Sequence, residues 1–438
     1  MTVEFPDADA LRTANDVDVE DYPRFAVAHR HRDLAPIEDV TAAGREAVAD
    51  LPLEDIQRGG EIAVTAGSRG ITDMPAVTAG AVAELQARGF EPFVLAAMGS
   101  HGGATAEGQR ETLESLGFTE EYLGCEIRAS MDVERIGEDG MGWPVHAAND
   151  ALAGDAVILA NRVKPHTDFS GPVESGLCKM AVVGLGKHRG AESLHNAGLA
   201  AEFDDVILDR TRMLLDAAGV VGGVALVEDA REHATLVEGI PADEILEREP
   251  ELLERAYEEL PTLPVEDLDL LIVDELGKDI SGTGMDTNVI GRYHFYGEDE
   301  PGRPEITRVY VRSLTEPSHG NALGVGLTDF AHRDLVEAID FGDMYVNIAT
   351  SGEPERSKVP FVVPDDRTAL EIIPSTLGLG DLSELRAARI RNTLDPDELV
   401  VSEPVARDLE DRENVTVGPL EPLSLVEERL PPDPYPGD

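Results

Sequence analysis

The chain has 438 residues, of which 87 are Asp or Glu and 36 are Lys or Arg, so its formal net charge is -51. Nucleic-acid binding needs a basic face that neutralises phosphates, and this composition argues strongly against one. The two cysteines, Cys125 and Cys178, are too few for a disulfide framework and form no CxxC metal pair.

The charged residues are biased in kind as well as in sign. Only five of the basic residues are lysines. An acidic surface that favours arginine over lysine is typical of proteins in concentrated salt, where mutual carboxylate repulsion is screened, so we predict a halophilic surface. The first residues are polar, and no apolar run reaches the length of a membrane span, so we expect a cytoplasmic protein without a membrane partner.

Short apolar runs alternate along the chain with amphipathic segments, which is typical of parallel sheets covered by helices. Strands are expected at 61–67, 91–99, 155–163, 222–228, 269–277 and 344–351. Helices are expected at 74–88, 105–116 and 241–260. Gly89 and Gly117 end the first two, and Pro250 is expected to split the third.

The proline-containing stretch 260–269 precedes a new buried strand and indicates a domain boundary. We therefore predict two α/β domains with largely parallel sheets, at residues 1–262 and 263–420, and an active site in the cleft between them. The acidic, proline-rich end at 421–438 is expected to be disordered.

Three polar loops follow predicted strands and contain Arg69, His101 and His166. In open parallel sheets, ligands bind in loops beyond the carboxyl ends of the strands. An arginine can clamp a carboxylate or phosphate through two hydrogen bonds, and two histidines can act as acid and base on opposite faces of a ligand. The alternative is a surface arginine and two histidines in ordinary turns.

The lysines that remain are candidates for chemistry that arginine cannot perform. Lys179 lies in the apolar stretch SGLCKMAVVGLG, which favours the neutral, nucleophilic amine. A lysine at the edge of the core is the alternative. Lys187, with Gly184 and Gly186 in GLGKHRG, is a candidate for lining a phosphate-binding loop, although the spacing matches no nucleotide fingerprint.

Two further residues are candidate ligands. His195 has no second metal-binding residue at helical spacing, so a metal there would take most of its ligands from a group outside the protein. A lone histidine on a helix is more often structural. Lys278 belongs to the glycine-rich loop 275–296, which we interpret as lining a domain cleft; an ordered connection is the alternative.

The motif series resembles the nickel-dependent lactate racemase family. It consists of GSRG (67–70), GSHGGAT (99–105), KPHTDFSGPVESGLCK (164–179) and SLHNAG (193–198). The segment 277–292 is similar to a glycine-rich segment in distant members of the superfamily. The resemblance implies an isomerase that racemises or epimerises a 2-hydroxy acid with nickel in a pyridinium-dithio mononucleotide, the nickel-pincer nucleotide. It implies a small 2-hydroxy-acid substrate and cofactor maturation enzymes as partners, and it allows a homo-oligomer.

The resemblance also implies roles for individual residues. Lys179 would carry the cofactor covalently, and His195 would bind the nickel. His101 and His166 would be the acid and base. Substrate contacts would come from Arg69 and Lys278, and cofactor phosphate contacts from Lys187, Gly184 and Gly186.

The chain departs from the family pattern in two places. The loop between His166 and Lys179 is longer than in the lactate enzymes, and Ala66, Gly67 and Ser68 stand where an Asp is expected. A larger 2-hydroxy acid is therefore as compatible with the sequence as lactate. Two other interpretations stay open: a hydrolase or lyase of a sugar acid or sugar phosphate without pincer nickel, and a non-catalytic binder of a nucleotide or carboxylate metabolite.

Overall fold

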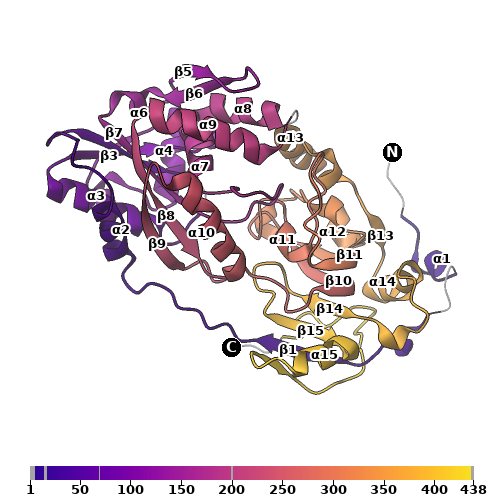
Figure 1. The fold of residues 1–438 in the computed structure, drawn as a ribbon. Helices are drawn as coiled ribbons and strands as arrows, with labels where there is room; N and C mark the ends of the chain where they lie inside the picture. The colour runs from indigo at the N-terminus through magenta and orange to yellow at the C-terminus, as the bar shows by residue number, and fades with distance from the viewer. Residues whose placement is uncertain (1–4, 14–16, 69, 199–200, 436–438) are drawn as a thin grey trace. The chain divides into compact units, whose positions relative to one another are not determined.

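A computed structural model describes residues 5–13, 17–68, 70–198 and 201–435 of the chain (Figure 1). The chain forms two compact units, one of residues 34–260 and one that combines residues 1–33 with 261–438. Each unit contains one mostly parallel sheet with helices packed against it. The predicted α/β class is therefore confirmed.

The unit of residues 34–260 is built on a six-stranded sheet with the order β4-β3-β2-β7-β8-β9. All neighbouring strands are parallel except β8 and β9. The inner strands are buried on both faces, which explains their nearly continuous apolar sequences. The strands are β2 (Glu61–Ala66), β3 (Glu91–Ala96), β4 (Ile127–Arg128), β7 (Ala156–Arg162), β8 (Val220–Glu228) and β9 (Ala234–Pro241), with a separate hairpin of β5 (Val133–Glu138) and β6 (Pro144–Ala148).

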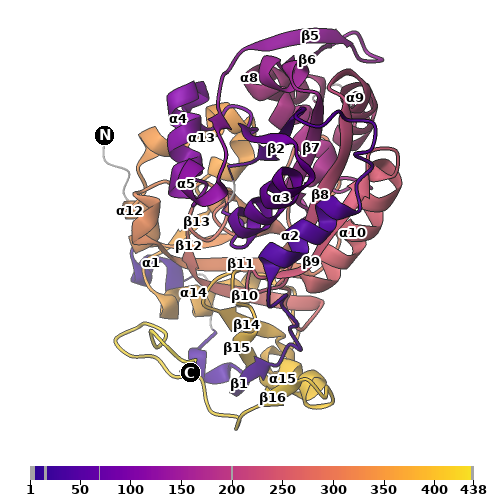
Figure 2. The ribbon, with the colours of Figure 1, turned by 90° about the vertical axis from the view of Figure 1, so that its left-hand side faces the viewer.

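Helices cover both faces of this sheet. An added Cβ at Gly222 would lie 2.6 Å from Leu51, whereas one at the next residue, Gly223, would lie 2.5 Å from Leu177 on the other face. Figure 2 shows α2 and α3 lying side by side. The helices are α2 (Val40–Ala49), α3 (Met74–Arg88), α4 (Ala106–Ser115), α5 (Glu120–Leu123), α6 (Asn149–Ala153), α7 (Leu177–Lys179), the π-helix η3 (Met180–Leu185), α8 (Lys187–Gly198), α9 (Phe203–Ala217) and α10 (Ile245–Glu259).

Helix α10 is continuous, so the prediction that Pro250 splits it is wrong. Proline removes one main-chain hydrogen bond from a helix interior. Here the helix buries one side against the unit, including Ile245, Glu249, Leu252 and Leu253. Packing of that side stabilises the helix enough to offset the missing bond.

The second unit contains an eight-stranded sheet with the order β13-β12-β11-β10-β14-β15-β1-β16. Its strands are β1 (Phe25–Arg30), β10 (Asp267–Leu276), β11 (Glu305–Leu314), β12 (Phe330–His332), β13 (Phe361–Val363), β14 (Ala387–Ile390), β15 (Glu398–Ser402) and β16 (Val415–Val417). Its helices are α1 (Ala8–Arg12), α11 (Thr287–Ile290), α12 (Arg333–Glu337), α13 (Phe341–Ser351), α14 (Asp366–Ile372) and α15 (Glu403–Glu410).

The N-terminal segment belongs to this second unit and not, as predicted, to a domain of residues 1–262. Strand β1 pairs antiparallel with β15 and β16, so that Phe25 lies opposite Ser402 and Ala28 lies opposite Val417. Pairing over so long a sequence separation leaves no local pattern from which it could be predicted.

The predicted disorder of the tail is wrong for residues 421–435; residues 436–438 lie outside the described part. Leu430 and Tyr435 are buried, and the Tyr435 hydroxyl donates to Asp274 Oδ2 at 3.0 Å. Leu430 N–H donates to Asp366 Oδ2 at 2.7 Å. The tail is ordered because its few apolar residues and its main chain find buried partners.

The predicted strand 344–351 is instead part of helix α13. The Asp340 carboxylate accepts from Gly342 N–H at 2.8 Å and caps the start of the helix. Met344 and Ile348, four residues apart, are buried, and Gly352 ends the helix with a φ of 83°. The apolar residues in this window follow helical spacing.

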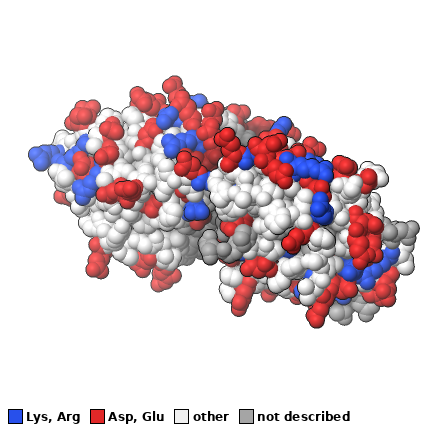
Figure 3. Space-filling view, turned by 90° about the horizontal axis from the view of Figure 1, so that it is seen from below, with Lys and Arg blue, Asp and Glu red and all other residues white. Residues whose placement is uncertain are grey.

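Acidic side chains are spread over the face drawn in Figure 3, with basic side chains between them. Many basic groups pair with carboxylates at the surface, as Arg248 does with Glu238 at 2.7 Å. Exposed pairs of this kind contribute little to stability. None of the helices described here has the length and apolarity of a membrane span.

Candidate active site

The order in which the chain adds strands to the six-stranded sheet reverses between β2 and β7. The chain runs from β2 outward to β3 and β4, and then returns to place β7 and β8 on the other side of β2. Such a switch point is where ligands bind in open α/β sheets, beyond the carboxyl ends of the strands. Because β2, β3 and β7 are parallel, the loops after β3 and β7, which contain His101 and His166, start from one edge of the sheet.

The loop after β7 is closed on itself. Lys164 and Ser175 exchange main-chain hydrogen bonds of 2.8 and 3.2 Å, and Asn161 Nδ2 donates to Gly176 O at 2.8 Å. Glu174 is buried within this loop, and its Oε1 accepts from the Tyr257 hydroxyl of α10 at 2.9 Å. Burial raises the pKa of the Glu174 carboxyl. The loop is thus an ordered support for the residues it presents.

His166 is held by its main chain and by one ring nitrogen. Its N–H donates to Glu174 Oε2 at 2.5 Å, and its Nδ1 accepts from Asp168 N–H at 3.1 Å. Because Nδ1 accepts this bond, the neutral ring carries its proton on Nε2. The Asp168 carboxylate lies 3.7 Å from Nδ1. The ring packs against Phe169, with a centroid distance of 4.6 Å. Its other nitrogen, Nε2, contacts the Lys179 amine.

Lys179 reaches this position because α7, η3 and α8 follow one another across the edge of the sheet. An added Cβ at Gly67, just after β2, would lie 3.3 Å from Met180. One at Gly99, after β3, would lie 2.9 Å from Val183. The helical stretch that carries Lys179 therefore packs on the loops that follow β2 and β3.

His101 follows β3 at the same edge and is exposed. Its Nδ1 lies 3.0 Å from Met98 O. A carbonyl oxygen only accepts, so this contact places the proton on Nδ1 and leaves the lone pair on Nε2, where it can accept a proton.

The predicted phosphate-binding loop is helical. An added Cβ would lie 2.4 Å from Met180 Sδ at Gly184 and 2.4 Å from Val182 O at Gly186, so both glycines are needed for close packing. Lys187 is fully buried, with its amine on Ala96 O and on Gln109 Oε1, and burial lowers its pKa to about 8. These three residues pack in the interior of the unit and do not line a phosphate site.

The other predicted ligands divide into three cases. Arg69 lies outside the described residues. His195 lies in α8, and its side chain is also outside the described part. Lys278 belongs to the other unit, where its N–H donates to Ser318 Oγ at 2.7 Å and its amine contacts Gly282 O. Among the side chains that are described, no group of three or more His, Cys, Asp or Glu residues is arranged to hold a metal ion.

No protein-family model and no curated protein sequence matches the chain. Among solved structures, the lactate racemase apoprotein from Thermoanaerobacterium thermosaccharolyticum is similar at 12% sequence identity and a TM-score of 0.46, over 85% of this chain and 98% of that chain. A protein from Thermotoga maritima is similar at 13% identity and a TM-score of 0.46, over 78% of this chain and 84% of that chain. Similarity at this level assigns neither a family nor an activity.

Two buried carboxylates support the site and were not predicted. Glu174 holds His166, and Glu249 accepts from Cys178 N–H at 2.9 Å, next to Lys179 in α7. Burial raises the pKa of Glu249 to about 7. Its position could have been found, because it lies three and four residues from Leu252 and Leu253 on the buried side of α10.

Glu249 is expected to make the unit of residues 34–260 less stable as the pH rises. Its folded pKa of about 7 exceeds the ordinary value of 4.5, so the folded state binds the extra proton between these values. The contribution of Glu249 to the free energy of unfolding is therefore fully present below pH 4.5. It is lost as the pH rises through 7, by about 3 kcal/mol in all. Glu249→Gln, which keeps an acceptor oxygen, should remove this dependence, whereas the exposed Glu258→Gln should not. Urea unfolding between pH 5 and 8.5 tests this, and parallel pH curves for the wild type and Glu249→Gln would contradict it.

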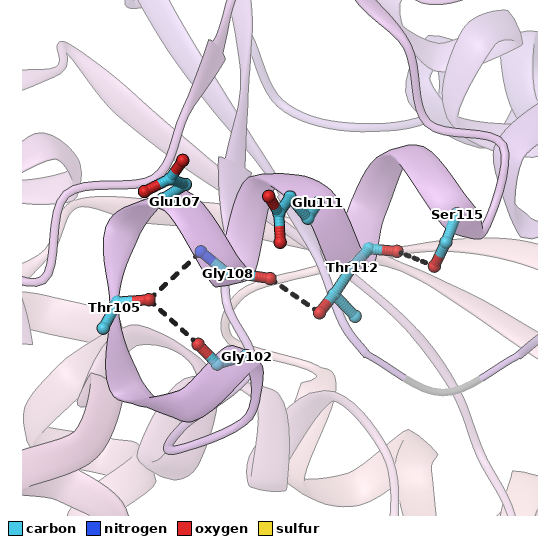
Figure 4. Close-up of a pocket in the computed structure, with 7 residues that line it drawn as sticks. All are labelled: Gly102, Thr105, Glu107, Gly108, Glu111, Thr112 and Ser115. Atoms are coloured by element: carbon cyan, nitrogen blue, oxygen red, sulfur yellow. Dashed lines mark hydrogen bonds between the residues drawn. The ribbon is translucent and has the colours of Figure 1, made fainter.

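A hollow on the exposed side of α4 is not suited to an anionic substrate (Figure 4). Thr105 Oγ1 there is engaged with Gly102 O at 3.1 Å and with Gly108 N–H at 3.1 Å, as a helix cap. Two glutamates stand on its rim and would repel a carboxylate. The hollow is lined by Gly102, Thr105, Glu107, Gly108, Glu111, Thr112 and Ser115.

Proposed function

We propose that the chain is a racemase or epimerase of a 2-hydroxy acid, acting at the carboxyl edge of the six-stranded sheet. The observation that carries this proposal is the contact between the Lys179 amine and His166 Nε2, at the switch point between β2 and β7. The motif series around these residues, with its resemblance to the nickel-dependent lactate racemases, supports the same function.

Lys179 fits the covalent attachment of a nucleotide cofactor. Its side chain is partly exposed and contacts His166 Nε2. The N–H at Nε2 of the neutral ring can be donated only to the uncharged amine, which is the form that reacts. The buried Lys187 does not fit the phosphate contact expected of it. A nickel-pincer nucleotide, when bound, would supply a centre that accepts and returns a hydride; Lys179 would hold it, with His195 as the nickel ligand.

The side chains of the chain itself would move the proton. In its charged form, His166 would donate the proton on Nε2 to the substrate oxygen, with the Asp168 carboxylate, 3.7 Å from Nδ1, stabilising the charge on the ring. His101, with its lone pair on Nε2, would accept the proton of the substrate hydroxyl from the loop after β3. The hydroxyl groups of the two enantiomers point in different directions, so their proton is removed and returned at different positions, and these two histidines stand on separate loops of one edge.

The test is intact mass and metal analysis of protein purified from its native host. We expect a mass excess of nucleotide size on the peptide that contains Lys179, together with nickel. Lys179→Arg should lose both, because a guanidinium is a far poorer nucleophile. Lys164→Arg, a matched change in the same loop, should keep both.

Activity is then measured by chiral chromatography on single enantiomers of lactate and of larger 2-hydroxy acids. Loss of enantiomeric purity with the wild type, and none with Lys179→Arg, is the expected result. An unmodified Lys179 peptide in protein that still racemises these acids would overturn the cofactor assignment. A modified protein that racemises none of them would overturn the reaction.

A further inference from the structure

Lys187 occupies a position that the proposed chemistry does not use. Its side chain is 0% exposed, and its amine contacts Ala96 O, at the end of β3, and Gln109 Oε1 at 3.3 Å. Its φ is 51°, a left-handed conformation that costs energy for any residue with a Cβ. Glycine would adopt this backbone conformation at a lower cost. The strain at this position is therefore offset by the contacts that the lysine side chain makes.

The lysine fixes the orientation of Gln109, which is also fully buried, on α4. An ammonium only donates hydrogen bonds, so it turns the amide oxygen of Gln109 toward itself. The amide nitrogen then faces the loop after β3, where it donates to Gly99 O at 3.0 Å and to His101 O at 3.3 Å. A charged group in the interior thus determines what Gln109 offers to this loop.

The loop itself has little stiffness. Gly99, Gly102 and Gly103 all have positive φ values, of 59°, 66° and 64°, and His101 lies between them. Glycines leave the main chain many alternative conformations. At the ends of the loop, Ala97 N–H donates to Ala66 O at 2.7 Å and Thr105 Oγ1 donates to Gly102 O at 3.1 Å. The two bonds from Gln109 bind the carbonyls of Gly99 and His101, in the middle of the loop.

We infer that Lys187 and Gln109 are positioning residues that hold the loop of residues 97–103 and thereby aim His101 at the substrate. The inference rests on the proposed role of His101 in racemisation. The contacts that carry it belong to the chain alone, so they can be tested in protein without cofactor.

The first test is hydrogen–deuterium exchange of the unloaded protein at the His101 and Ala104 amides, which donate to Met98 O and Ser100 O. Gln109→Glu keeps a partner for Lys187 but cannot donate to the two carbonyls, and Gln109→Leu removes both functions. Each should speed exchange at these amides by about tenfold or more. Lys187→Met, which frees the Gln109 amide to turn, should act in the same direction.

Gln86→Leu is the matched control. Gln86 is an exposed glutamine whose Nε2 donates to Gly124 O at 2.9 Å, in the same unit. It should leave exchange at His101 and Ala104 unchanged. Unchanged exchange at these amides in both Gln109 variants would overturn the inference.

The second readout is the His101 ring, followed by ¹⁵N NMR of the unloaded protein. In the wild type, the proton should be on Nδ1, and the Gln109 variants should show a mixture of the two tautomers. A merely structural role would lower the melting temperature without changing the tautomer, and that result would also overturn the inference. A protein that racemises no 2-hydroxy acid but shows these changes would refute the proposed function and leave the positioning contacts established.

Discussion

His166→Ala is expected to lower kcat/KM for racemisation of the 2-hydroxy acid by roughly 10²–10⁴-fold, the usual contribution of a positioned general acid or base. The ring is held at Nδ1 by the N–H of Asp168 and presents Nε2 toward Lys179, so its removal takes away the proton-transfer group nearest the attachment residue. The loop should keep its conformation, because Glu174 binds the main-chain N–H of residue 166 and not its ring.

The measurement compares turnover of the two proteins at equal cofactor occupancy, determined by mass. His233→Ala, which removes a half-exposed histidine in the same unit, is the control and should keep full activity. His166→Ala with near wild-type kcat/KM at equal occupancy would contradict the acid–base role. A pH profile that loses its His166-dependent limb in the variant would support it.

The local features of the site could be predicted from sequence, because they depend on local patterns. Strands β2, β3 and β7 are buried on both faces and therefore have continuous apolar sequences. Once they are read as parallel strands, the loops that carry His101 and His166 must meet at one edge. The contact between His166 and Lys179 could not be predicted in this way, since it depends on how the loop between them closes.

The features that could not be predicted depend on distant parts of the chain. GLGKHRG has the composition of a loop, yet burial of Lys187 against β3 makes its amine an interior contact. Phe25 of strand β1 pairs with Ser402, and Tyr435 of the tail binds Asp274, so both contacts join distant parts of the chain. In helix α10, the spacing of Glu249 from Leu252 and Leu253 indicates that it lies on the buried side, but not that its carboxylate accepts from the Cys178 N–H.

Asp274→Ala is expected to destabilise the second unit by about 3–5 kcal/mol, the usual cost of leaving a buried charge without its partner. Asp274 is 6% exposed on β10 and binds two arginines: Oδ1 accepts from Arg389 Nε and from an Arg312 guanidinium nitrogen, both at 2.8 Å. In the variant, Arg312 keeps its ion pair with Asp366 at 2.7 Å, whereas Arg389 loses its ion pair with Asp274.

The matched control is Asp408→Ala, which removes a half-exposed carboxylate that pairs with Arg386 at 2.7 Å in the same unit. Exposed pairs contribute about 0–1 kcal/mol, so calorimetry should show little change. For Asp274→Ala, the melting temperature of this unit should fall by on the order of 10 °C. Equal melting temperatures for the two variants would contradict the assignment of a buried ionic centre.

The same substitution should also release the tail, because Asp274 accepts from the Tyr435 hydroxyl and Arg389 donates to Pro431 O at 2.6 Å. Hydrogen exchange over residues 429–435 should rise in Asp274→Ala and not in Asp408→Ala. Tyr435→Phe, which removes only the hydroxyl, should loosen the tail at a smaller cost, about 1 kcal/mol. A tail that exchanges equally fast in all of these proteins would show that its order does not depend on Asp274. The expected graded response would instead make this carboxylate the point where β10, β14 and the end of the chain are joined.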